Sequence, residues 1–279
     1  MSAAESSLDI QRILVALDAS PQSLAALEAA TQLAARFEAE LIGIFVEDIN
    51  LIRLANFPFT REVSRYSATP RPLDSPQIEL QLRARARRVQ QAMSTMTKGT
   101  GLRWSFRVAR GVISVELVAA TLEADLIILG KTGWSGRRRV GSTTRTMIVQ
   151  SPRQVLILQR KVRLGVPITV AFDGSEAGQK ALEAARLIWA EESPVNVLLL
   201  ADNSDEAQRL QAEARDQLGR LATDAQFSWR PGLDGPRLAR LLRTEGCGVL
   251  VLPAESEQIS GEILFNLLNE IECAVLLVR

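Results

Sequence analysis

Short apolar runs alternate with segments of helical spacing along the whole chain. In the first 160 residues, runs rich in Leu, Ile and Val are expected to form strands at 13–17, 41–46, 104–108, 126–129 and 155–158. Helical patterns lie between them at 23–37, 78–97, 115–122 and 143–150. Continuous β-branched and leucine runs that alternate with helices are typical of a parallel sheet covered on both faces. The pattern therefore predicts an α/β fold.

The same order returns in the rest of the chain, which predicts a duplication. Strands are expected at 168–172, 195–200, 227–229, 249–252 and 275–278. The run that ends in Asp18 leads into Ala-Leu-Glu-Ala-Ala at 26–30, and the run that ends in Asp173 leads into the same five residues at 181–185. An identical segment at the same distance from an aspartate indicates an internal repeat. We expect two domains, residues 1–162 and 163–279, each with an open five-stranded sheet.

An insertion at 49–78 interrupts the first copy. It contains Pro58, Pro70, Pro72 and Pro76, and this composition resists regular structure. Three interpretations fit it: a lid, a partner surface or disorder.

Composition excludes several classes of enzyme and metal site. The chain has no histidine, which removes Ser-His-Asp and Cys-His nucleophile pairs, histidine general bases and imidazole metal ligands. Its two cysteines, Cys247 and Cys273, are too few for a disulfide framework and lack zinc-type spacing. We expect buried free thiols and no metal site.

Charge is unevenly divided between the copies. Residues 1–160 hold 21 Lys and Arg against 14 Asp and Glu, and residues 161–279 hold 12 against 18. This asymmetry suits attraction between the halves, binding of an anion by the first half, or an ordinary solvated surface, and we favour the last. Arg83, Arg85, Arg87 and Arg88 are interpreted as a solvated or domain-contacting helix rather than a nucleic-acid site.

Apolar runs are too short to cross a membrane, and we expect a soluble cytoplasmic protein.

A glycine-rich loop follows the fourth strand of the first copy. It runs from Gly130 to Ser142 and contains Arg137, Arg138 and Arg139. Glycines let backbone amides approach an anion, and the helix that follows adds N–H donors and a favourable dipole. Ser142 is expected to be the helix N-cap, with a hydroxyl that either satisfies backbone amides or binds a phosphate oxygen. The sequence thus predicts a phosphate cradle.

The loop does not match two common nucleotide motifs. A Walker A sequence needs a glycine where Asp125 stands, and no G-x-G-x-x-G is present, since Gly99 and Gly101 are followed by Trp104.

The strand that ends in Asp18-Ala-Ser and the glycine loop followed by Val-Leu-Ile-Leu at 155–158 resemble the universal stress proteins. The resemblance covers both copies. It implies an adenine nucleotide alpha hydrolase-like fold, in which two open parallel sheets of order 3-2-1-4-5 carry helices on both faces. In that order the ends of strands one and four meet at a topological switch point, the expected ligand crevice. It also implies a homodimer, or a pseudo-dimer in which the last strands, 155–158 and 275–278, pair across an internal pseudo-twofold.

The resemblance also implies a set of binding residues. ATP-binding members place the strand-one aspartate near the adenosine, a strand-two valine near the base, and the glycine loop with its Ser or Thr around the phosphates. The corresponding residues are Asp18, Val46, Gly130, Gly133, Gly141 and Ser142. The interval between Gly133 and Gly141 is shorter than in the binding members, which implies a cradle that is either tighter or shifted in register, and Gly136 is expected to help the shortened loop close.

The second copy departs further from this pattern. It keeps Asp173, but its fourth strand ends in Pro253-Ala-Glu255-Ser-Glu257, and only Gly261 remains of the glycines. Proline removes an N–H donor, and the two glutamates repel phosphate. We expect no ATP in this copy.

The leading hypothesis is a stress-response protein that binds ATP, or a related adenine nucleotide, in domain 1 as a regulatory ligand, with Mg²⁺ as a companion ion. Hydrolysis is slow at most, because no general base or Walker lysine is visible. The alternative is a nucleotide-free scaffold in which both sites have decayed and the insertion and the oppositely charged halves recruit a protein partner.

Overall fold

The computed structural model describes residues 9–57, 59–63, 70–133, 139–159, 167–188, 195–256, 259 and 261–279. The first copy contains, in chain order, β1 (Arg12–Leu17), α1 (Pro21–Phe37), β2 (Glu40–Asp48), α2 (Ile49–Ala55), β3 (Arg61–Val63), β4 (Pro70–Pro72), α3 (Ser75–Thr97), β5 (Trp104–Gly111), α4 (Ile113–Ala120), the 3-10 helix η1 (Thr121–Glu123), β6 (Leu126–Gly130), α5 (Ser142–Gln150) and β7 (Gln154–Leu158).

The second copy repeats the alternation. It contains β8 (Ile168–Phe172), α6 (Glu176–Ile188), β9 (Val195–Leu199), α7 (Ser204–Leu218), η2 (Gly219–Thr223), β10 (Ala225–Trp229), α8 (Gly235–Glu245), β11 (Val249–Pro253), α9 (Gly261–Glu270) and β12 (Ala274–Val278). The expected domain boundary at 162/163 falls in the stretch 160–166, which lies outside the described residues.

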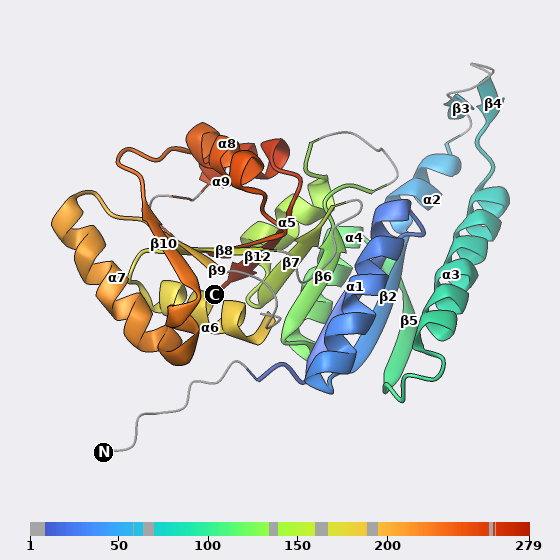
Figure 1. The fold of residues 1–279 in the computed structure, drawn as a ribbon. Coiled ribbons are helices and arrows are strands. Elements are labelled where there is room, and N and C mark those ends of the chain that lie inside the picture. The colour runs from blue at the N-terminus through green and yellow to red at the C-terminus, as the bar shows by residue number, and fades with distance from the viewer. Residues whose placement is uncertain are drawn as a thin grey trace.

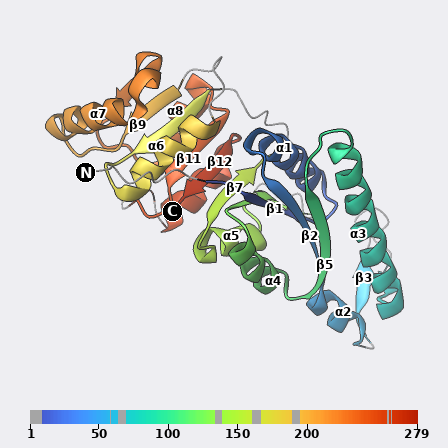
Figure 2. The ribbon, with the colours of Figure 1, turned by 90° about the horizontal axis from the view of Figure 1, so that it is seen from below.

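Each copy has five parallel strands in the predicted order 3-2-1-4-5. In the first copy the order is β5-β2-β1-β6-β7, and in the second it is β10-β9-β8-β11-β12. The two sets do not stay separate, because β7 and β12 pair antiparallel and join them into one ten-stranded sheet. Figure 2 shows this sheet crossing the molecule from β11 and β12 through β7 to β1, β2 and β5.

The junction between the copies has an internal pseudo-twofold. Leu156 and Leu276, the central residues of β7 and β12, lie opposite one another, with Val155 opposite Leu277 and Ile157 opposite Val275. Every residue of both strands is buried, so the contact is an apolar sheet core. The predicted pairing of the last strands is therefore present within one chain, and these two edges are used internally.

Helices cover both faces of the sheet. Buried side chains of α1, α3, α6 and α7 pack on one face, and those of α4, α5, α8 and α9 pack on the other. Figure 1 shows this layering clearly in the second copy, where α8 and α9 lie above the strands and α6 and α7 below them. Both cysteines are free, and Cys273 is buried whereas Cys247 is only half-buried.

The expectation that the insertion resists regular structure is wrong. Asp48 caps α2 by accepting a hydrogen bond from the Asn50 N–H at 2.9 Å, and β3 and β4 form a two-stranded antiparallel ribbon. Pro70 and Pro72 are the two ends of β4 in this isolated pair, where a missing N–H is tolerated, and Pro76 lies in the first turn of α3. Figure 1 shows the ribbon projecting beyond α2 and α3. Pro58 and residues 64–69 lie outside the described residues.

Candidate functional site

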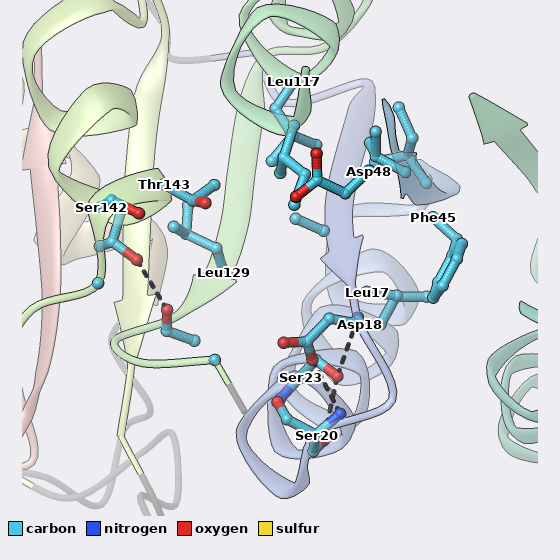
Figure 3. Close-up of a pocket in the computed structure, with 18 of the residues that line it drawn as sticks. Leu17, Asp18, Ser20, Ser23, Phe45, Asp48, Leu117, Leu129, Ser142 and Thr143 are labelled. Carbon is cyan, nitrogen blue, oxygen red and sulfur yellow. Dashed lines mark hydrogen bonds between the residues drawn. The ribbon is translucent and has the colours of Figure 1, made fainter. Parts of the chain in front are cut away.

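The turn after β1 fixes the Asp18 carboxylate. Asp18 Oδ1 accepts a hydrogen bond from the Ser20 N–H at 2.8 Å, and the Asp18 N–H donates to Ser23 Oγ at 3.3 Å. The Ser20 hydroxyl in turn caps α1 by accepting from the Ser23 N–H at 3.2 Å. The strand therefore passes directly into the helix through an Asx turn, which Figure 3 shows at the lower edge of a pocket.

The same turn contains a backbone conformation that is unusual for its residue. Ala19 has φ of 64°, in the left-handed region, and the equivalent residue of the second copy is Gly174 with φ of 75°. A non-glycine residue pays a steric cost in this region. Residues held in this region cluster at functional sites, although Glu38, with φ of 54°, is the C-cap of α1.

Two glycines of the loop after β6 come close to the start of α1. A Cβ added to Gly130 would lie 2.8 Å from Gln22 Cβ, and one added to Gly133 would lie 2.9 Å from Asp18 Oδ2. Both distances are shorter than real Cβ contacts. The predicted glycine positions thus allow β6 and the loop to approach β1 and α1, which brings Gly133 beside Asp18.

The two ends of the glycine loop, residues 130–142, are held together. The Gly141 N–H donates to the Lys131 carbonyl at 2.9 Å, and the Thr144 hydroxyl donates to the Gly130 carbonyl at 3.0 Å. A Cβ on Gly141 would make only ordinary contact, 3.5 Å from the Lys131 carbonyl oxygen. The middle of the loop, including Gly136, Arg137 and Arg138, lies outside the described residues.

The expectation that Ser142 is the N-cap of the following helix is wrong. Gly141 is the N-cap of α5, and no side chain makes a capping hydrogen bond there. Ser142 is one residue further on, inside the first turn, and Figure 3 shows Ser142 and Thr143 across the pocket from Phe45 and Asp48. The hydroxyl of Ser142 is therefore not the cap of α5, which leaves the ligand interpretation of this residue standing.

A cavity of about 350 Å³ lies between these elements. All six residues predicted from the family resemblance line it, namely Asp18, Val46, Gly130, Gly133, Gly141 and Ser142. Its apolar wall comes from β2, β6 and α4, through residues such as Phe45, Leu117 and Leu129. The cavity thus opens at the carboxyl ends of β1 and β6, the switch point that the strand order predicted.

Sequence reasoning missed several residues of the lining. Asp48, at the end of β2, adds a second carboxylate, and Arg85 on α3 adds a half-buried cation. Arg87 and Arg88 are exposed, whereas Arg85 is half-buried in the cavity lining, which the interpretation of this run as a solvated or domain-contacting helix did not include. The spacing of residues along α3 indicated this place, because Arg85 lies between Leu82 and Ala86, which are both buried.

Lys131 points away from the cavity and toward the second copy. Its ammonium donates to the Gln159 side-chain oxygen at 3.3 Å and to the carbonyls of Asn269 and Ile271 at 3.4 and 3.3 Å. The residue is 7% exposed, and burial lowers the pKa of the ammonium from its usual value, with nearby Glu272 acting in the opposite direction. Lys131 is therefore a residue of the domain junction.

The corresponding crevice of the second copy has different chemistry. Asp173 keeps the turn, because its Oδ1 accepts from the Ser175 N–H at 3.0 Å. The register of β11 with β12 and of β6 with β7 makes Pro253 the counterpart of Gly130. The equal spacing of α5 before β7 and of α9 before β12 makes Leu264 the counterpart of Thr144. Leu264 is buried, so an apolar side chain stands where the first copy ties its helix to the strand through a hydroxyl. Glu257, the second expected glutamate, lies outside the described residues.

Within the part of the chain that the structure describes, no three His, Cys, Asp or Glu side chains gather as candidate metal ligands. No helix among the described residues is both long and apolar enough to span a membrane.

Solved structures with the same architecture cover nearly the whole chain. A universal stress protein from Archaeoglobus fulgidus DSM 4304 superposes with a TM-score of 0.72 at 15% identity, covering 98% of this chain and 99% of that one. A putative universal stress protein from Pseudomonas aeruginosa UCBPP-PA14 gives 0.59 at 16% identity, over 98% and 95%. A functionally unknown protein from Pseudomonas aeruginosa PAO1 gives 0.57 at 16%, over 99% and 94%. At these identities the likeness concerns the fold.

The comparison with curated proteins found no match. The family model described as the universal stress protein family matches residues 9–54 and 59–159, which together are more than half of the chain and contain all six predicted site residues. The unmatched interval at 55–58 falls within the insertion. Because the match covers the first copy and the fold repeats in the second, the chain belongs to the universal stress protein family and contains two domains of that fold.

Proposed function

We propose that the first copy binds ATP, or a related adenine nucleotide, as a regulatory ligand. The observation that carries the proposal is that one cavity is lined by all six residues taken from the family's binding motif. These residues come from β1, β2, β6, the glycine loop and α5, so their convergence depends on the whole domain. The cavity has the size of a small-molecule site, for which about 300–1,000 Å³ is usual.

The chemistry of the lining suits the two ends of a nucleotide. The apolar wall with Val46 and Phe45 offers a surface for the base, and the Asp18 carboxylate is an acceptor for hydroxyl or amino groups of the adenosine. The phosphates would meet Gly133, Gly141 and the first turn of α5, where the backbone amides and the helix dipole favour anions. Mg²⁺ would enter as the companion ion of the phosphates.

The site offers little chemistry for fast hydrolysis. The chain has no histidine, and the only lysine of the glycine loop, Lys131, is bonded to carbonyls of the second copy. Occupancy of the site, rather than turnover, is then the regulatory signal, and hydrolysis is slow at most.

A second candidate function is a nucleotide-free scaffold that binds a protein partner. Large apolar side chains are exposed at the insertion: Leu54 and Phe57 at the end of α2, Phe59, which is 92% exposed, and Val63 in β3. Exposed apolar groups that gather in one segment favour protein contacts. This candidate makes no use of the cavity, so a nucleotide titration separates the two functions.

The test compares the two strand-one aspartates by isothermal titration calorimetry with Mg·ATP. In Asp18→Asn the side-chain oxygen still accepts from the Ser20 N–H, but the charge is lost. We expect weaker binding by about 2 kcal/mol, or roughly thirtyfold, which is the usual contribution of a charged hydrogen bond.

Asp173→Asn is the matched control, because Asp173 occupies the same turn in the second copy. We expect it to bind ATP as the wild type does. No binding by the wild type up to millimolar ATP rejects the nucleotide function and favours the scaffold. An equal loss in both variants rejects the assignment to the first copy.

A further inference from the structure

The end of α9 in the second copy contacts both ends of the glycine loop of the first copy. At the far end of the loop, the Val140 N–H donates to the Asn269 side-chain oxygen at 2.8 Å. At the near end, the Lys131 ammonium donates to the backbone carbonyls of Asn269 and Ile271. Asn269 is therefore in contact with both ends of the loop.

The Val140 contact lies directly before the first turn of α5. Val140 precedes Gly141, the N-cap of the helix, and Ser142, its first residue. The Gly141 N–H is bonded to the Lys131 carbonyl, so two successive amides have fixed acceptors on different domains. These two bonds set the direction in which the backbone enters α5, and with it the place of Ser142 and Thr143 in the cavity.

The Lys131 contact suits the end of a helix. The carbonyls at the C-terminus of a helix carry partial negative charge and lack partners within the helix, so they favour a cation. Gln159, which follows β7, joins the same contact. Its side chain donates to the Ile271 carbonyl and accepts from the Lys131 ammonium. The loop of the first copy is thus fastened to the second domain by polar contacts beside the β7–β12 junction.

The corresponding contact from the first copy to the second has no acceptor side chain. The register of α5 and β7 against α9 and β12 makes Val149 the counterpart of Asn269. The side chain of Val149 has no polar atom, and the residue is 65% exposed. The second copy therefore provides a side-chain acceptor at Asn269, and the first copy has no polar side chain at the corresponding position, Val149.

We propose that Asn269 is a positioning residue through which the second domain holds the two ends of the glycine loop, at Lys131 and Val140, in the arrangement that binds nucleotide. This inference rests on the proposed nucleotide function. It gives the degenerate copy a role, since it completes the site of the other copy. Because linkage is reciprocal, nucleotide in the first copy also strengthens the contact with α9, which makes the domain junction the element that reports occupancy.

Three variants test the proposal in the full chain. Asn269→Leu keeps the approximate size but removes the acceptor, whereas Asn269→Asp keeps an acceptor oxygen for the Val140 N–H. Phe265→Leu is the matched control, because Phe265 lies under the Arg145 guanidinium at 4.0 Å across the same junction without a hydrogen bond to the loop. The readouts are the dissociation constant for Mg·ATP and, without ligand, the hydrogen exchange of the Val140 amide by NMR.

We expect Asn269→Leu to weaken binding roughly fivefold, the effect of one net hydrogen bond, and to speed exchange at Val140. Asn269→Asp and Phe265→Leu should stay near the wild type in both measurements. Wild-type binding and exchange in Asn269→Leu overturn the proposal, and so does an equal loss in Phe265→Leu. If the wild type binds no nucleotide, the proposed function fails, and unchanged exchange at Val140 in Asn269→Leu then also rejects the hold on the loop.

Discussion

The two copies share a scaffold and differ in the crevice that the scaffold builds. Both place an aspartate at the end of the first strand, in a turn whose next residue has positive φ. They differ after the fourth strand, where Gly130 in one copy corresponds to Pro253 in the other. The strand order, the turn and the helix that follows belong to the fold, and the ligand chemistry belongs to the loop after the fourth strand.

The turn after the first strand also shows a difference in strain. The second copy uses Gly174 at the positive-φ position, where a Cβ would lie 2.6 Å from Leu210 Cδ2. The first copy places Ala19 there, beside the candidate site. The site that we propose to be active is thus the one whose backbone carries a steric cost, in line with the tendency of strain to persist at functional positions.

Among substitutions that test the difference between the two turns, Gly174→Ala is expected to change the free energy of unfolding most. The added methyl group collides with Leu210 and places a non-glycine residue at φ of 75°. We expect the free energy of unfolding to fall by about 2–3 kcal/mol, measured by urea denaturation. A change below about 0.5 kcal/mol would show that the turn of the second copy is not under this constraint.

The reciprocal variant, Ala19→Gly, is expected to have a smaller effect of opposite sign. Glycine removes the steric cost at φ of 64°, but it also adds freedom to the unfolded chain, so we expect a gain in unfolding free energy of about 0.5 kcal/mol. A loss of stability in the same denaturation experiment contradicts the idea that Ala19 is strained.

The smallest effect concerns the pH dependence that Lys131 adds to the first copy, whose counterpart in the second is Ala254. Burial lowers the pKa of Lys131 in the folded state. Between that lowered pKa and the ordinary value of 10.5, the unfolded chain holds the proton and the folded chain does not. Raising the pH through this window therefore favours the folded state.

The measurement is the unfolding free energy of the wild type minus that of Lys131→Met, followed from pH 7 to pH 10.5. We expect this difference to increase with pH. A difference that falls with pH would mean that the contacts of Lys131 with Asn269 and Ile271 outweigh its burial and raise its pKa.

Much of the fold could be predicted from the sequence because parallel strands leave a local pattern. Runs such as 126–129 and 155–158 are continuously apolar since both faces of the sheet are covered. The duplication gave a second, independent pattern for each strand, because the same order of apolar runs returns in the second copy. The family resemblance supplied the strand order and the pairing of the last strands, and the structure has both.

Local details were less predictable. The N-cap of α5 is Gly141 rather than Ser142 because the Gly141 carbonyl accepts the first helical hydrogen bond, from the Arg145 N–H at 2.9 Å, and no sequence pattern shows that bond. The prolines of the insertion suggested irregular structure, but they occupy helix-start and ribbon positions that tolerate proline.

Apart from the pairing of β7 with β12, the contacts between the copies were not predicted. Asn269 and Lys131 are 138 residues apart in the chain, and each reads as an ordinary polar residue in its own segment. The place of Arg85 beside the cavity was not predicted for a related reason, since it depends on how α3 packs against β2. The six site residues were found from a motif, whereas the residues that support or extend the site required the three-dimensional structure.

The central claim is that one copy binds nucleotide and the other does not. Native mass spectrometry of the intact chain, equilibrated with excess Mg·ATP and then desalted, measures the number of nucleotides per chain directly. The account predicts one nucleotide bound in the wild type and a strongly reduced bound fraction in Asp18→Asn. Two nucleotides per chain would contradict the asymmetry between the copies, and none would contradict nucleotide binding itself.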